Sequence, residues 1–169
     1  MGRPKALIEI DGVAMADHVA ATLRDVGCSK VVALGGDPEE FATLSMPVVV
    51  DATPATGPLG GVLGAVENAT GWVFVVACDL PGLTAAALRP MIAAARSHPD
   101  ADVVVARTGR IEPACALWNT AAATRLRALH EAGERALYAV IGQLSSVEVP
   151  VEAASLANIN TPHDLDRYP

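Results

Sequence analysis

VFVVACDLP, the stretch Val73–Pro81, places an unbroken apolar run directly before Cys78 and Asp79. A run rich in β-branched and aromatic residues, apolar on both faces, is typical of a strand inside a buried parallel sheet. Asp79 then lies at the carboxyl end of that strand, with an apolar wall behind it. A carboxylate in such a place needs a cation, an ion pair or hydrogen-bond donors.

On both sides of this stretch, short apolar runs alternate with alanine-rich stretches of helical period. This order is typical of a βαβ protein with a buried parallel sheet. Thr84 can begin a helix over 85–97, which Pro90 is expected to split into a short turn and a helix from near residue 89. The sequence predicts strands at 31–34, 48–50, 73–77, 103–106, 114–118 and 145–149, and helices at 15–26 and 120–132, ended by Gly27 and Gly133.

The amino-acid composition further restricts the class of protein to which this chain can belong. The chain has 169 residues, of which 51% are hydrophobic, and this argues for one globular domain over residues 1–169 rather than a disordered chain. With 12 Lys and Arg against 19 Asp and Glu, the net charge is −7. Since nucleic-acid binders carry a basic face, we expect no nucleic-acid partner. The apolar runs fall short of the roughly 18 residues of a membrane span, so we also expect no membrane partner.

The cysteines favour a reducing compartment. Cys28, Cys78 and Cys115 are odd in number and contain no C-x-x-C pair. We therefore expect buried, reduced thiols in a cytoplasmic protein.

An α/β sheet binds its ligand outside the carboxyl ends of its strands, which directs attention to loops that follow strands. Asp79 suits a Mg²⁺ ion, which is usually held by one or two carboxylates and substrate phosphates; capping the next turn is the alternative. The loop Asp51–Gly61 contains three glycines and two prolines. It either lets an anion approach helix N-terminal amides or makes a tight connection.

Two further groups of polar residues are candidates. Lys5 follows Arg3 and Pro4, so two cations are available for a phosphate chain, unless the lysine is simply solvated. Asn158 and Asn160 share a face in an extended segment, where their amides suit phosphate or ribose oxygens or else stabilise a turn. The four histidines are scattered, and we expect them at the surface.

Taken together and in order, Met1–Leu7, Thr56–Gly61, Ala77–Pro81 and Asn158–Pro162 resemble the molybdenum cofactor guanylyltransferase family. Glu112–Trp118 is similar to a strand that these enzymes place after the metal site. The resemblance implies a Rossmann-like nucleotidyltransferase fold, three-layer α/β/α, with a mostly parallel sheet. It also implies transfer of GMP from GTP to the molybdopterin cofactor, release of pyrophosphate and a need for Mg²⁺.

The same resemblance implies partners and site residues. The substrates would be GTP and molybdopterin, with transient contacts to molybdoenzymes or their chaperones. By position, the resemblance implies that Lys5 and Asp79 are catalytic and that Asp79 holds Mg²⁺. The implied nucleotide-binding residues are Lys5, Asp51, Gly57, Gly61 and Asp79. The implied pterin-binding residues are Asn158 and Asn160.

One departure from the family pattern concerns the start of the sequence. The family begins with a strand and a glycine-rich loop before the segment that matches Met1–Leu7. We therefore expect Met1 to be an internal methionine of a longer natural chain. Without the central strand, the predicted strands 31–34 and 73–77 would each show an unpaired apolar edge.

Three other functions remain open at this point. A sister enzyme would use CTP for the same pterin, or GTP for another phosphorylated acceptor. A non-catalytic relative would carry the nucleotide or pterin without transfer. A flavodoxin-like receiver domain would use Asp79 as a phospho-acceptor, although it would lack the usual acidic pair.

Overall fold

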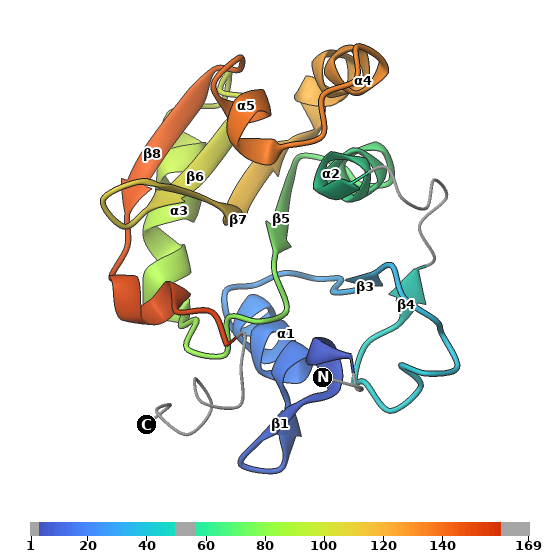
Figure 1. Ribbon diagram of the computed structural model, residues 1–169. Helices are drawn as coiled ribbons and strands as arrows, with labels where there is room; N and C mark the ends of the chain where they lie inside the picture. Colours follow the sequence, from blue (N-terminus) through green and yellow to red (C-terminus); the bar gives the residue numbers. More distant parts are fainter. Residues whose placement is uncertain (1–3, 50–56, 160–169) are drawn as a thin grey trace.

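The computed structural model describes residues 4–49 and 57–159. Its largest sheet has four strands, and Figure 1 shows their arrangement. β7 is antiparallel to both β5 and β6, whereas β6 and β8 are parallel. Three of the four strands therefore share one direction, as expected, but two of the three pairings are antiparallel, so the sheet is mixed. The order across the sheet is β5 (Trp72–Val76), β7 (Ile111–Asn119), β6 (Val103–Arg107) and β8 (Ser146–Pro150).

Two shorter pairs of strands accompany this sheet. β3 (Ala33–Leu34) is parallel to β4 (Val48–Val49). β3 is shorter than the predicted strand 31–34, and the last residue of the predicted strand 48–50 lies outside the described residues. β1 (Glu9–Ile10) and β2 (Val13–Ala14) form a hairpin that the sequence analysis missed. Its two-residue turn is Asp11-Gly12, with φ of 52° and 77°, which is the left-handed geometry that a tight hairpin requires.

Helices cover both faces of the sheet, which confirms the three-layer α/β/α arrangement (Figure 1). Alternate residues of β6 serve the two layers: Val104 packs with one set of helices and Val105 with the other. The first face holds α1 (Met15–Asp25) and α3 (Ala85–Ser97), and the second holds α2 (Gly57–Glu67), α4 (Ala123–Glu131) and α5 (Leu137–Ile141). Three 3-10 turns complete the order: η1 (Lys5–Leu7), η2 (Thr120–Ala122) and η3 (Ala153–Leu156).

The expectation that Pro90 splits its helix is wrong. α3 runs without a break from Ala85 to Ser97, with the Thr84 side chain capping its N-terminus. Pro90 lacks the N–H that would bond to the Ala86 carbonyl, but both residues are exposed, so water can reach that carbonyl. No helix within residues 4–49 and 57–159 combines the length and the apolar character needed to cross a membrane.

β5 is less buried than the sequence predicts. All five of its residues are of intermediate exposure, whereas Val103–Ala106 of β6 are fully buried. Within the described residues, β5 forms its ladder with β7 alone, and β3 forms its ladder with β4 alone. The two unpaired strand edges that the sequence predicts are therefore present in this part of the chain.

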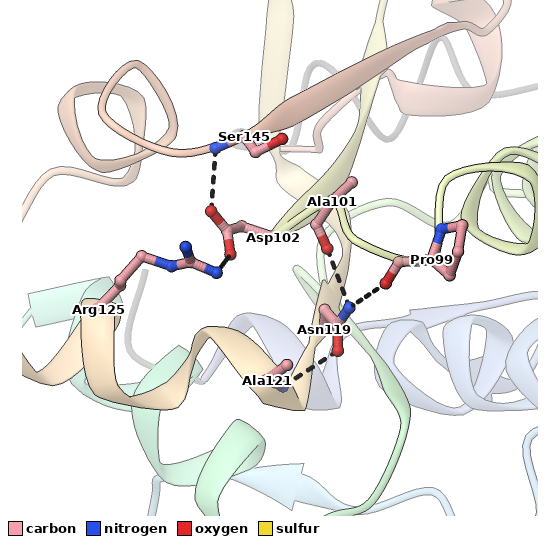
Figure 2. Close-up of polar contacts among 7 residues, drawn as sticks. All are labelled: Pro99, Ala101, Asp102, Asn119, Ala121, Arg125 and Ser145. Carbon is pink, nitrogen blue, oxygen red and sulfur yellow. Dashed lines mark hydrogen bonds and ion pairs between the residues drawn. The ribbon is translucent and has the colours of Figure 1, made fainter.

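A buried carboxylate ties the start of β6 to its surroundings (Figure 2). The Asp102 side chain is 3% exposed, and its Oδ1 lies 2.5 Å from Nη2 of Arg125 on α4. Its Oδ2 accepts a 3.0 Å hydrogen bond from the Ser145 backbone N–H just before β8. Next to it, the Asn119 side chain binds the carbonyls of Pro99 and Ala101. These contacts fix the strand ends opposite the carboxyl end of β5.

We predict that Asp102→Ala lowers the free energy of unfolding by about 2–3 kcal/mol, because the Ser145 N–H and the Arg125 guanidinium both lose their charged acceptor. Asp100→Ala is the matched control, since Asp100 is exposed and two residues away. Urea unfolding checks both. Equal, small losses in the two variants would contradict a structural role for Asp102.

The three cysteines differ in burial. Cys115 is fully buried in β7, whereas Cys28 and Cys78 are half-buried, so the expectation of buried thiols holds fully only for Cys115. Burial raises the pKa of the Cys115 thiol to about 12, and the nearby Glu112 charge adds to the effect.

The alkylation rates of the cysteines should follow their exposure, with the most buried thiol reacting most slowly. At pH 8 the Cys115 thiolate is scarce and inaccessible, so we expect iodoacetamide to modify Cys28 at least roughly tenfold faster than Cys115 in the folded protein. Raising the pH should increase the thiolate fraction of Cys115. Mass spectrometry of the peptides measures both rates. Similar rates for the two residues in folded protein would refute this account.

Candidate functional site

Asp79 lies where the sequence predicts, just beyond the carboxyl end of β5. The pairing with β7 extends to Ala77, whose N–H donates to the Ala114 carbonyl at 2.8 Å. Leu80 and Leu83 beyond it are buried at 1% and 4% exposure, and they anchor the loop in the core. The Asp79 side chain retains 15% exposure, so its carboxylate faces solvent from a largely apolar surround.

Lys5 reaches the same place from the other end of the sequence. It begins η1, and the buried side chain of Leu7 anchors that turn in the core. The Lys5 ammonium Nζ lies 3.3 Å from Asp79 Oδ2, with the lysine side chain 39% exposed. The structure therefore brings together the two residues expected to be catalytic, although they are 74 positions apart in sequence.

The C-terminal segment with the predicted asparagines adjoins this pair. The backbone N–H of Ile159 donates a 3.1 Å hydrogen bond to the Asp79 carbonyl. Asn158 is exposed, so its amide is accessible next to this bond. Asn160 lies outside the described residues. Of the predicted pterin-binding pair, Asn158 directly precedes the residue that binds the Asp79 carbonyl, and Asn160 stays a prediction.

The predicted nucleotide-binding glycines lie together on α2. Gly57 begins this helix with φ of 73°, a left-handed conformation that favours glycine. Gly61 follows one turn later, and a Cβ built there meets nothing within 4 Å. Packing therefore leaves room for a side chain at position 61 and does not by itself require glycine there. Asp51 lies outside the described residues.

Arg135 is a charged residue near these glycines that the sequence analysis missed. A Cβ built at Gly57 would lie 3.3 Å from Cβ of Arg135, so the arginine borders the start of α2. Its Nη1 donates to the carbonyls of His130 and Glu134 at 2.7 and 2.6 Å. No recognisable motif surrounds Arg135, so only the packing of α2 against the segment after α4 reveals it.

The Cys78 thiol next to the carboxylate is not an activated nucleophile. Burial raises its pKa above the ordinary value, and the charge of Asp79 raises it further, against a smaller opposing effect of Lys5. The thiol is therefore protonated at neutral pH. A thiolate nucleophile is therefore not available at this position at neutral pH.

Comparison with known sequences identifies the family. The model of the MobA-like NTP transferase domain family matches residues 1–148. The molybdenum cofactor guanylyltransferase of Pseudomonas syringae pv. tomato is 33% identical over 165 residues, which is 95% of this chain and 82% of that protein.

Two solved structures resemble the fold. Molybdopterin-guanine dinucleotide biosynthesis protein A from Archaeoglobus fulgidus matches with a TM-score of 0.78 and 22% identity, over 99% of this chain and 89% of that one. The 2-C-methyl-D-erythritol 4-phosphate cytidylyltransferase of Thermus thermophilus matches with a TM-score of 0.74 and 18% identity, over 98% of this chain and 92% of that one.

At these identities the solved structures show the fold alone, and it is the nucleotidyltransferase fold that the sequence predicts. The receiver-domain interpretation is therefore wrong. The sequence matches go further, since they extend over the segments that contain Lys5 and Asp79. The chain belongs to the MobA-like NTP transferase family, among the molybdenum cofactor guanylyltransferases, and it is a nucleotidyltransferase.

Proposed function

We propose that the chain transfers GMP from GTP to the terminal phosphate of molybdopterin carrying molybdenum. An oxygen of the pterin phosphate attacks the α-phosphorus of GTP, and the bond from that phosphorus to the bridging oxygen breaks. Pyrophosphate leaves with the electron pair, and a new phosphoanhydride joins GMP to the pterin. The family membership and the meeting of Lys5 with Asp79 support this reaction.

The contact between Lys5 and Asp79 is the observation that carries the proposal. The reaction brings two polyanions together, so its barrier depends on neutralising phosphate charge as the leaving group departs. Lys5 supplies a positive charge at the carboxyl end of β5, where this fold binds its ligands. In a chain with net charge −7, such a local cation is needed to attract a triphosphate.

The donor set at Asp79 fits a Mg²⁺ ion. Its carboxylate is a hard oxygen ligand with partial solvent access. Within the described residues no group of three or more His, Cys, Asp or Glu side chains is placed to hold a metal, so substrate phosphates would complete the coordination. When bound, Mg²⁺ supplies charge neutralisation at the α-phosphate and the pyrophosphate. Lys5 would then bind the remaining phosphate oxygens.

The chain does not need a general base for this reaction. A phosphate monoester has a second pKa of about 6, so the attacking oxygen is already largely deprotonated near neutral pH. Of the three described histidines, His18 contacts the Ile10 carbonyl, His98 contacts the Ala94 carbonyl, and His130 lies on α4, on the second face of the sheet. Positioning and charge therefore account for the proposed catalysis.

The remaining predicted residues would hold the two substrates. We assign the nucleotide to Asp51 and to the start of α2 with Gly57 and Gly61, where helix N-terminal amides suit an anion. Arg135, which borders Gly57, adds a positive charge on that side. Asn158 and Asn160 would hold the pterin phosphate from the C-terminal segment. Transient contact with molybdoenzymes or their chaperones would deliver the product.

A cytidylyltransferase activity is the second candidate, because a cytidylyltransferase shares this fold with a TM-score of 0.74. The preference of the enzyme for the guanine or the cytosine nucleotide must therefore be tested directly. With molybdenum-loaded molybdopterin and Mg²⁺, we expect GTP to support pyrophosphate release at least roughly tenfold faster than CTP, since a site built for one base leaves polar groups unpaired with the other. Release with CTP alone would contradict the guanylyl assignment.

We predict that Asp79→Asn lowers kcat/KM by on the order of 100- to 1,000-fold, because it removes the charge from the proposed metal ligand at constant shape. The folded state should lose about 1 kcal/mol or less, since the ion pair with Lys5 is partly exposed. Steady-state kinetics and thermal unfolding measure the two effects. Asp100→Asn, at an exposed site, is the control. A loss of thermal stability in proportion to the loss of activity would instead indicate a structural aspartate.

A further inference from the structure

Ile159 is the one buried residue at the end of the described C-terminal segment. It is 4% exposed, whereas Asn158 and Ala157 before it are exposed. Its side chain packs in a small cluster with Ile10 and Met15, which are 8% and 0% exposed, and Ile8 contacts the same cluster. This cluster is separate from the two large cores that flank the main sheet. The buried Ile159 side chain therefore packs the C-terminal segment against β1 and the start of α1 rather than against either main core.

The backbone of Ile159 holds the loop of the proposed metal ligand. Its N–H donates to the carbonyl of Asp79 at 3.1 Å. That bond joins the C-terminal segment to the residue whose carboxylate contacts Lys5. A single residue therefore contacts the Asp79 loop through its main chain and the N-terminal hairpin through its side chain.

The hairpin side of this contact leads back to Lys5. The N–H of Ile8 donates to the Lys5 carbonyl at 3.0 Å, and the N–H of Met15 donates to the Ile8 carbonyl at 2.8 Å. The His18 ring also contacts the Ile10 carbonyl at 3.0 Å. The turn of Lys5, the β1–β2 hairpin and the start of α1 therefore form one hydrogen-bonded unit, and Ile159 packs against that unit.

We propose that Ile159 is a positioning residue that links three segments of the site: the Lys5 turn, the Asp79 loop and the segment of Asn158. The catalytic consequence of this positioning rests on the function proposed above. The physical reason is that residues 157–159 form neither helix nor strand, so the buried side chain of Ile159 is needed to fix Asn158 next to it. Site residues held in place by such packing keep the geometry that phosphoryl transfer needs.

The test compares Ile159→Ala with Ile141→Ala. Ile141 has the same side chain, is 2% exposed, and lies in the core cluster around α2, α4 and α5 rather than in the cluster of Ile159. It therefore reports the cost of losing a buried isoleucine elsewhere. Ile159→Val, which keeps most of the burial, is included in case the alanine variant folds poorly, and a smaller change in the same direction is expected.

Two readouts separate positioning from stability. In Ile159→Ala we expect the KM for molybdopterin to rise by on the order of tenfold to a hundredfold and more than the KM for GTP, because a displaced Asn158 weakens acceptor binding. Amide hydrogen exchange in peptides covering residues 5–10 and 78–83 should also quicken. In Ile141→Ala we expect neither change, even where its melting temperature falls equally.

The outcomes are decisive in both directions. Changes of equal size in Ile159→Ala and Ile141→Ala, in proportion to their melting temperatures, would overturn the inference. If the wild-type protein transfers no GMP, the proposed function fails, and hydrogen exchange alone decides the linkage. Faster exchange at residues 78–83 in Ile159→Ala alone then supports it, and unchanged exchange refutes it.

Discussion

A carboxylate at the end of an apolar strand loses much of its hydration, and the Lys5 ammonium 3.3 Å from Asp79 offsets part of that loss. The two side chains come from segments far apart in the sequence. Their meeting requires β5 to end at the correct edge of the sheet and the turn of Lys5 to be fixed by the buried Leu7. The site thus depends on the packing of both regions.

The two ends of the sheet differ in the burial of their polar residues. At one end, Asp102, Arg125 and Asn119 join strand ends to a helix through buried polar contacts. At the carboxyl end of β5, the polar residues are partly exposed, and the Asp79 loop is held by main-chain bonds and apolar anchors. Rigid packing beneath partly hydrated charges suits an enzyme that must bind a triphosphate from water.

Much of this arrangement follows from the sequence. The apolar run before Asp79 fixes a strand and its end, and glycines at positions 27 and 133 have the positive φ expected after helices. The β1–β2 hairpin was missed even though Asp11-Gly12 is a strong turn signal, because its strands are only two residues long. Pairing directions, the half-buried state of β5 and the contact of Arg135 with Gly57 depend on tertiary packing, which local patterns do not encode.

The proposed reaction requires a nucleoside triphosphate to bind with its phosphates between Lys5 and Asp79. A crystal structure of the protein with Mg²⁺ and a non-hydrolysable GTP analogue tests it most directly. The account predicts a metal ion on the Asp79 carboxylate, phosphate oxygens around that ion, and the Lys5 ammonium on the same phosphates. A triphosphate bound away from the carboxyl end of β5, with the Lys5–Asp79 pair undisturbed, would contradict it.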